Sequence, residues 1–147
     1  MKGQSTSGTG FSAEKFFKSF AGILKPYLAD AKISSKAISD PDYQVPLDRH
    51  CFLMEMVAAR SNDPNLGLKL GTQYHPSDMG VLGHALLNAP DVGALLDNFV
   101  RYLSVYSRGC LMKLEIDGNQ ATFIYEYDIT YPGPLGRVQE AECTWRW

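Results

Sequence analysis

Apolar residues recur at helical spacing through the first 106 positions of the chain and alternate with polar residues after them. The clearest helical pattern covers residues 90–106, where one broad apolar stripe lies opposite Asp97 and Arg101. Pro90 opens this helix and Asp91 falls in its first turn. The pattern predicts a long amphipathic helix that packs on a neighbouring layer. Its stripe consists of Val92, Leu95, Leu96, Phe99, Tyr102, Leu103 and Tyr106.

A second predicted helix, over residues 77–88, is apolar almost all round. A helix of this kind is expected to be buried on several sides. Gly80 and Gly83 each weaken it by roughly 1 kcal/mol relative to alanine, so we expect another backbone or a ligand close to them. His84 and Asn88 are the only polar residues in its second half.

The first 60 residues have the pattern of a helical wrapper around these two helices. A first helix is predicted after Ser12, which suits an N-cap, and it ends or kinks at Pro26. Residues 30–45 form a polar connector, after which Pro46 begins another helix. The core stripe of that helix is predicted to contain Leu47, Cys51, Met54 and Ala58, widened by Leu53 and Val57.

Two turn signals divide the chain further. Asp63-Pro64 starts a short helix, and Gly71 is predicted to end it, because glycine adopts a left-handed conformation at little cost. After residue 109, the alternating segments CLMKLEI and QATFIYEYD flank Asp117-Gly118-Asn119, which is a strong β-hairpin signal. Alternation predicts one face of the first strand with Met112, Leu114 and Ile116, and one face of the second strand with Ala121, Phe123, Tyr125 and Tyr127.

These elements predict an α+β fold, with a helical N-terminal half and two central helices packed on a small antiparallel sheet that includes the β-hairpin. Residues 1–11, rich in Gly, Ser and Thr, are predicted to be disordered, and residues 12–147 to form a single domain. Residues 137–147 have the pattern of a helix start. That start stops abruptly on Trp145-Arg146-Trp147, as if the chain were cut before its natural finish.

Composition and charge exclude several classes. The net charge is −2 and no cluster of Lys and Arg is longer than a pair, which argues against nucleic-acid binding by this chain itself. No signal peptide is visible, and no apolar run approaches the roughly 20 residues that span a bilayer. Three cysteines without metal-ligand spacing fit reduced core thiols. We therefore expect a cytoplasmic protein.

No catalytic constellation is apparent, so an enzyme is not expected. The chain has no GxSxG, HExxH, P-loop or GxGxxG motif, and its three histidines lack the spacing of metal ligands. Tyr106-Ser107-Arg108 resembles a tripeptide of haem-based nitric-oxide sensors, but no proximal histidine stands at a matching place. No metal and no cofactor are therefore expected.

A binding pocket is the remaining possibility. His84, Asn88, Tyr102 and Tyr106 are predicted to line a cavity between the two central helices and the hairpin, alongside Tyr125. A few convergent polar groups in an apolar pocket suit small-molecule recognition. In the alternative interpretation, the tyrosines are core residues with hydroxyls at the surface, and His84 and Asn88 face solvent.

The segments LGLKLG and MGVLGHALLNAPDVGALLDNFVRYLSVY carry a family resemblance. They resemble the N-terminal regulatory domain of one branch of AraC/XylS-type transcription regulators, often labelled an arabinose-binding domain although few members sense arabinose. The resemblance covers about residues 15–145. The matching positions are Gly67 to Gly71, Gly80, Leu82, Gly83, Ala85, Ala89-Pro90, Ala94-Leu95 and Arg101-Tyr102, with weaker likeness at Asp40 to Arg49, Asn62 to Pro64 and Arg137 to Glu140.

The resemblance implies an effector-sensing and dimerisation domain of a bacterial regulator. A small molecule would shift the activity of a DNA-binding domain, and the family's C-terminal pair of helix-turn-helix motifs is not in this chain. His84, Ala89 and Gly93 depart from the family pattern, in which Tyr, Ser and Glu stand at those places. The alternative is an interaction or dimerisation module that has no small-molecule ligand.

Overall fold

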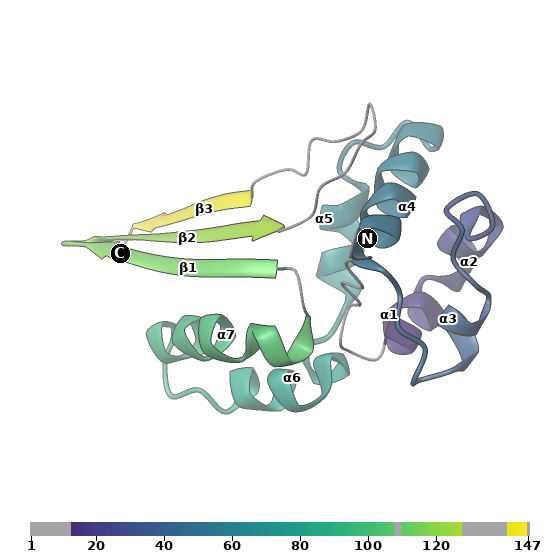
Figure 1. Cartoon of the computed structure of the whole chain (residues 1–147). Helices are drawn as coiled ribbons and strands as arrows, with labels where there is room; N and C mark the ends of the chain where they lie inside the picture. The colour runs from purple at the N-terminus through teal and green to yellow at the C-terminus, as the bar shows by residue number, and fades with distance from the viewer. Residues whose placement is uncertain (1–12, 108–109, 128–140, 147) are drawn as a thin grey trace, which may run out of the picture.

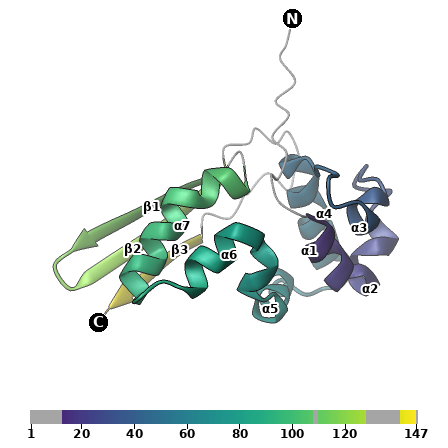
Figure 2. The same ribbon diagram turned by 90° about the horizontal axis from the view of Figure 1, so that it is seen from below.

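The computed structural model describes residues 13–107, 110–127 and 141–146, which fold into a helical lobe and a layered α/β lobe (Figure 1). The helical lobe contains α1, α2, the 3₁₀ turn η1, α3, α4 and α5. In the second lobe, α7 lies between α6 and the sheet (Figure 1), and Figure 2 shows α7 lying across the strands. The elements are α1 (Ala13–Ser19), α2 (Ala21–Leu24), η1 (Lys25–Tyr27), α3 (Lys36–Ser39), α4 (Leu47–Arg60), α5 (Leu66–Gln73), η2 (Pro76–Met79), α6 (Gly80–Leu87), α7 (Val92–Tyr106), β1 (Cys110–Asp117), β2 (Gln120–Tyr127) and β3 (Ala141–Arg146). The α+β prediction is confirmed.

Helices α1 to α5 pack on one another around a single hydrophobic core. The helix expected after Ser12 is divided into α1 and α2 at Phe20, and Pro26 follows in η1. Gly22 and Pro26 lie within five residues of each other and both weaken a continuous helix. Ser12 itself is outside the described residues. The buried core consists of Phe17, Phe20, Leu24, Leu28, Ala31, Ile33, Ala37, Val45, Leu53, Met56, Val57, Leu66 and Leu70.

Helix α4 ends in a left-handed turn at Asn62. Asn62 has a φ of 51°, and its N–H donates to the carbonyl of Ala59 (3.3 Å) while that of Asp63 donates to the carbonyl of Ala58 (3.0 Å). This pair of bonds is a Schellman motif. The predicted end of α4 near residues 60–62 is confirmed. The buried face of α4 differs from the predicted stripe. Met56, which the stripe does not include, is buried, whereas Cys51, Met54 and Ala58 of the stripe are only half-buried.

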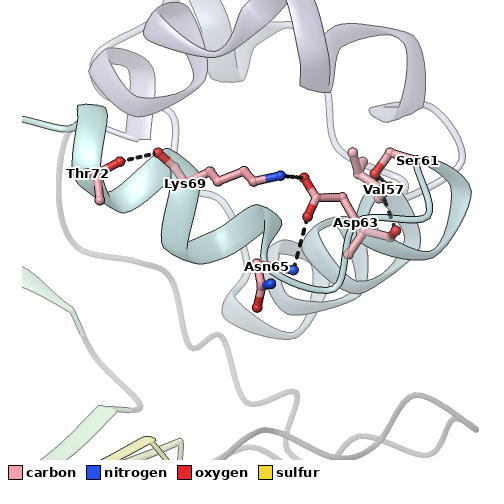
Figure 3. A network of polar contacts seen from close by, with 7 residues as sticks. Val57, Ser61, Asp63, Asn65, Lys69 and Thr72 are labelled. Carbon is pink, nitrogen blue, oxygen red and sulfur yellow. Dashed lines mark hydrogen bonds and ion pairs between the residues drawn. The ribbon is translucent and has the colours of Figure 1, made fainter.

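Helix α5 is held at its start by Asp63, whose carboxylate accepts from the N–H of Asn65 (3.2 Å) and from Lys69 Nζ (2.6 Å) (Figure 3). The hydrogen bond with Lys69 is the main reason that the pKa of Asp63 is lowered. The predicted helix end at Gly71 is wrong. The helix continues to Gln73 and ends where Tyr74 becomes extended, because Gly71 keeps a helical conformation.

Gly80 begins α6 directly after η2, and Gly83 lies within α6. Gly80 has a φ of +61°, a conformation that side chains rarely adopt, and there η2 gives way to α6. A Cβ on Gly83 would lie 1.7 Å from the carbonyl oxygen of Pro76, so the predicted close backbone is confirmed at Gly83. It is wrong at Gly80, where nothing lies within 4 Å of the place that a Cβ would take. The predicted burial of this helix on several sides is wrong. Val81 is 85% exposed and Leu87 is 52% exposed, because only one side of α6 is covered.

Helix α7 joins α6 to the sheet. Asp91 caps its start by accepting from the N–H of Ala94 (2.8 Å). Phe99 meets Phe123 of β2 edge-on at 6.1 Å between ring centroids. The outer part of the predicted stripe is exposed, since Val92 is 55% accessible. The second core consists of Leu47, Leu82, Leu86 and Leu103, with Cys51, Met79, Leu95, Phe99 and Met112 packed against it.

The sheet has three antiparallel strands in the order β1-β2-β3. The predicted hairpin is confirmed, with Asp117 paired to Gln120 and Gly118 in the turn at a φ of +57°. The predicted helix over residues 137–147 is wrong for residues 141–146, which form β3 and pair with β2, while residues 137–140 and 147 are outside the described residues. The pairing of β3 with β2 outweighs the local helical pattern. Thr144 and Trp145 also belong to residue types that favour strands.

Candidate ligand site and family

Two of the five predicted ligand residues lie together on α6. His84 and Asn88 are both exposed, and Asn88 Nδ2 donates to the carbonyl oxygen of His84 (2.7 Å). They share a side of the helix with Val81, because residues three and seven positions apart project in similar directions. That side lies opposite the buried Leu82 and Leu86. His84 and Asn88 therefore face outward, away from the contact between α6 and α7.

The three predicted tyrosines come from α7 and β2. Tyr102 is 41% exposed on α7. Tyr106 is the last residue of α7, and Tyr125 pairs with Met112 in the sheet; the side chains of these two tyrosines lie outside the described residues. The ligand-binding role of all five residues stays a prediction.

Four residues of α6 and its C-cap are exposed on the side away from the core, and we call them the α6 outer face: Val81, His84, Leu87 and Asn88. Val81 and Leu87 are its apolar members, and α6 contains no Asp, Glu, Lys or Arg. The polar groups on this face are therefore an imidazole and an amide, which donate and accept hydrogen bonds. Such a surface suits a neutral, partly apolar molecule or another apolar surface. It offers no acid-base pair for catalysis.

His50, on α4, has an environment that no pattern in the sequence indicates. Its ring lies 5.4 Å from that of Phe16 and 5.9 Å from that of Phe17, between centroids. Burial lowers the pKa of His50 from 6.5 to about 4, so the imidazole is neutral near pH 7. These aromatic partners come from α1, more than 30 residues away, and helical spacing within α4 does not reveal them. His50 belongs to the helical core and not to the α6 outer face.

Neither a metal site nor a membrane span is found in the part of the chain that the structure describes. No group of three or more His, Cys, Asp or Glu side chains there is arranged to hold a metal ion. Within the same residues, no helix is both long and apolar enough to cross a membrane.

Comparison with known proteins places these features in a family. Residues 24–146 match the family described as the arabinose-binding domain of AraC transcription regulator, N-terminal. A segment of 56 residues is 39% identical to the HTH-type transcriptional regulator VqsM of Pseudomonas aeruginosa. That segment is 38% of this chain and 17% of VqsM, so the chain matches only a small part of its relative's length. The predicted resemblance is confirmed, and the chain belongs to the family of N-terminal arabinose-binding domains of AraC transcription regulators.

Proposed function

We propose that this domain senses a small molecule and passes the result to a DNA-binding domain of the same bacterial, cytoplasmic regulator. The family match over residues 24–146 carries the proposal. The relative is named as an HTH-type transcriptional regulator, which supports an output through a helix-turn-helix domain. A ligand changes that output only if it binds one arrangement of the regulator more tightly than another.

We propose that the α6 outer face contributes His84 and Asn88 to ligand binding, and that the predicted tyrosines of α7 and β2 contribute as well. The candidate residues are His84, Asn88, Tyr102, Tyr106 and Tyr125. The absence of charged residues on α6 supports a neutral ligand, since a charged one would have no opposite charge on this helix. A sugar or similar polyol is the favoured class, because amide, imidazole and phenol groups supply hydrogen bonds and aromatic rings supply apolar contact.

A thermal-shift experiment tests this assignment. L-arabinose, which the family name suggests, and a panel of other neutral sugars are titrated against the chain. A true ligand raises the melting temperature as its concentration rises. At one hundred times its Kd it adds about 2.7 kcal/mol to the free energy of unfolding. Asn88→Ala should abolish the shift. Asn65→Ala, at an exposed asparagine immediately before α5 whose side chain makes no cap bond, should leave it intact. If no compound shifts the melting temperature, the sensing proposal fails.

The second candidate is a dimerisation or protein-interaction module without a ligand. The exposure of Val81 (85%), Leu87 (52%) and Val92 (55%) favours it, because exposed large apolar side chains can belong to an interaction site. Homodimerisation is compatible with both candidates, and light scattering across a concentration series measures it. A dimer in a protein that no small molecule stabilises would favour this second function.

A further inference from the structure

Strand β1 lies at an edge of the sheet. Among the described residues it pairs with β2 alone, and β3 occupies the opposite edge (Figure 1). An edge strand presents unpaired backbone N–H and C=O groups to whatever approaches it. The identity of those groups in β1 follows from the turn.

The hairpin geometry assigns the free backbone groups to even-numbered residues. With a two-residue turn, Asp117 and Gln120 form the hydrogen-bonded pair that closes the hairpin. Bonding alternates along an antiparallel pair, so the odd residues of β1 bond to β2. Met112, Leu114 and Ile116 therefore turn their N–H and C=O groups toward the free edge.

The side chains of β1 carry a charge pattern that is complementary to itself. Lys113 and Glu115 are both exposed, and across the hairpin they lie opposite Ile124 and Thr122, which carry no charge. They flank Leu114 symmetrically. If a second copy of β1 runs antiparallel with Leu114 opposite Leu114, each Lys113 lies opposite a Glu115. Those two positions form non-hydrogen-bonded pairs, where facing side chains are closest.

The same register satisfies the backbone and covers apolar surface. Leu114 meets Leu114, and Met112 meets Ile116 twice, so all three hydrogen-bonded pairs use the residues whose backbone groups are free. Ile116 is 70% exposed in the single chain and would gain Met112 of the second copy as a neighbour. Figure 2 shows that the hairpin end extends beyond α7, so this helix leaves the tip of β1 accessible.

We propose that two copies of this chain associate through their β1 edges, around a twofold axis at Leu114, into one continuous antiparallel sheet. Charges on an edge strand usually prevent such pairing. Here the two opposite charges favour one register, because sliding the second strand by two residues places Lys113 opposite Lys113 or Glu115 opposite Glu115. The proposal rests on the dimerisation part of the proposed function and names the surface that performs it.

Charge reversal tests this interface in the whole chain. Sedimentation equilibrium measures the dimer dissociation constant of the wild type, Lys113→Glu, Glu115→Lys and the double variant. Each single change converts two attractive cross-strand pairs into two repulsive ones and should raise the dissociation constant about tenfold or more. The double variant exchanges the charges and should restore the wild-type value. Arg101→Glu and Asp97→Lys, at exposed positions of α7, make the same charge changes and should have no effect.

Three results would overturn the β1 interface: a wild type that stays monomeric at every concentration, a dimer that neither single reversal weakens, or a double variant that stays as weak as the singles. A dimer insensitive to the reversals leaves dimerisation in place through another surface. A monomer whose melting temperature rises with a sugar leaves the sensing function in place. These outcomes distinguish loss of the β1 interface from loss of the proposed function.

Discussion

The two lobes bury their apolar residues to very different extents. The helical lobe has a single core of 13 buried hydrophobic residues, whereas the core shared by α4, α6 and α7 has four. The large hydrophobic residues that remain exposed show the opposite distribution. Among the described residues, two of them, Ile23 and Leu68, lie in the helical lobe. The other six lie in the α/β lobe: Val81, Leu87, Val92, Tyr102, Leu111 and Ile116.

This difference separates scaffold from interaction surface. A closed core stabilises its own lobe and leaves little apolar area for a partner. The α/β lobe has the reverse property, with apolar side chains on the α6 outer face and along β1 that a ligand or a second copy would cover. Both proposed sites therefore lie in the less completely buried lobe.

The largest expected effect is the difference between truncating a buried leucine in the helical lobe and an exposed one in the α/β lobe. Leu53→Ala removes a side chain that is 0% exposed in the helical core and should lower the free energy of unfolding by about 3–4 kcal/mol. Leu87→Ala, at a side chain that is 52% exposed, should change it by less than about 0.5 kcal/mol. Urea unfolding measures both. Equal losses at the two positions would abolish the contrast between the lobes.

A smaller effect is expected at Gly83, which lies within α6 and packs against Pro76 of η2. The Cβ of Gly83→Ala would meet the Pro76 carbonyl group, whose backbone must move, and we expect a loss of about 2–3 kcal/mol. Gly71→Ala is the matched control. Nothing lies within 4 Å of the place that a Cβ on Gly71 would take, and alanine there should stabilise α5 by about 0.5–1 kcal/mol. An unaffected Gly83→Ala protein would show that η2 does not pack tightly on α6.

The smallest expected effect is the pH dependence of the helical lobe. His50 has a pKa of about 4 in the folded protein, against 6.5 unfolded, so the unfolded chain binds more protons between these values. The contribution of His50 to the free energy of unfolding should therefore be fully present above about pH 6.5 and be lost as the pH falls toward 4. We expect a loss of about 1–2 kcal/mol, because solvent reaches the half-buried side chain and weakens the effect. His50→Phe keeps a ring and removes the proton site. Urea unfolding at several pH values should give this variant a flatter slope, and parallel slopes would exclude His50 as the cause.

Much of the fold is predictable because its signals are local. The α7 stripe, the Pro46 start of α4 and the Asp117-Gly118 turn each depend on residues within a few positions of one another. The errors occur where other contacts decide. The pattern predicts that Gly71 ends α5, but the helix continues to Gln73 and ends where Tyr74 becomes extended. The pattern also predicts a helix over residues 137–147, whereas residues 141–146 form β3 because β2 pairs with them.

The candidate site is predictable only in part, for a related reason. Residue types and the glycine spacing draw attention to α6, and His84 and Asn88 are indeed adjacent there. The pattern does not indicate which side of an almost wholly apolar helix is covered. Leu82 and Leu86 face the core while Val81 and Leu87 do not, and nothing in their chemistry distinguishes the two pairs.

By itself, the sequence determined the α+β class, the long helix, the hairpin and the membership of a regulator family, since periodicity, turn residues and motifs are properties of neighbouring residues. Only the tertiary structure decided that Gly83 lies against Pro76, that His50 is neutral among aromatic rings and that α6 and β1 keep apolar residues exposed. Each of these depends on which elements pack together, and burial is a property of that packing rather than of the residues alone.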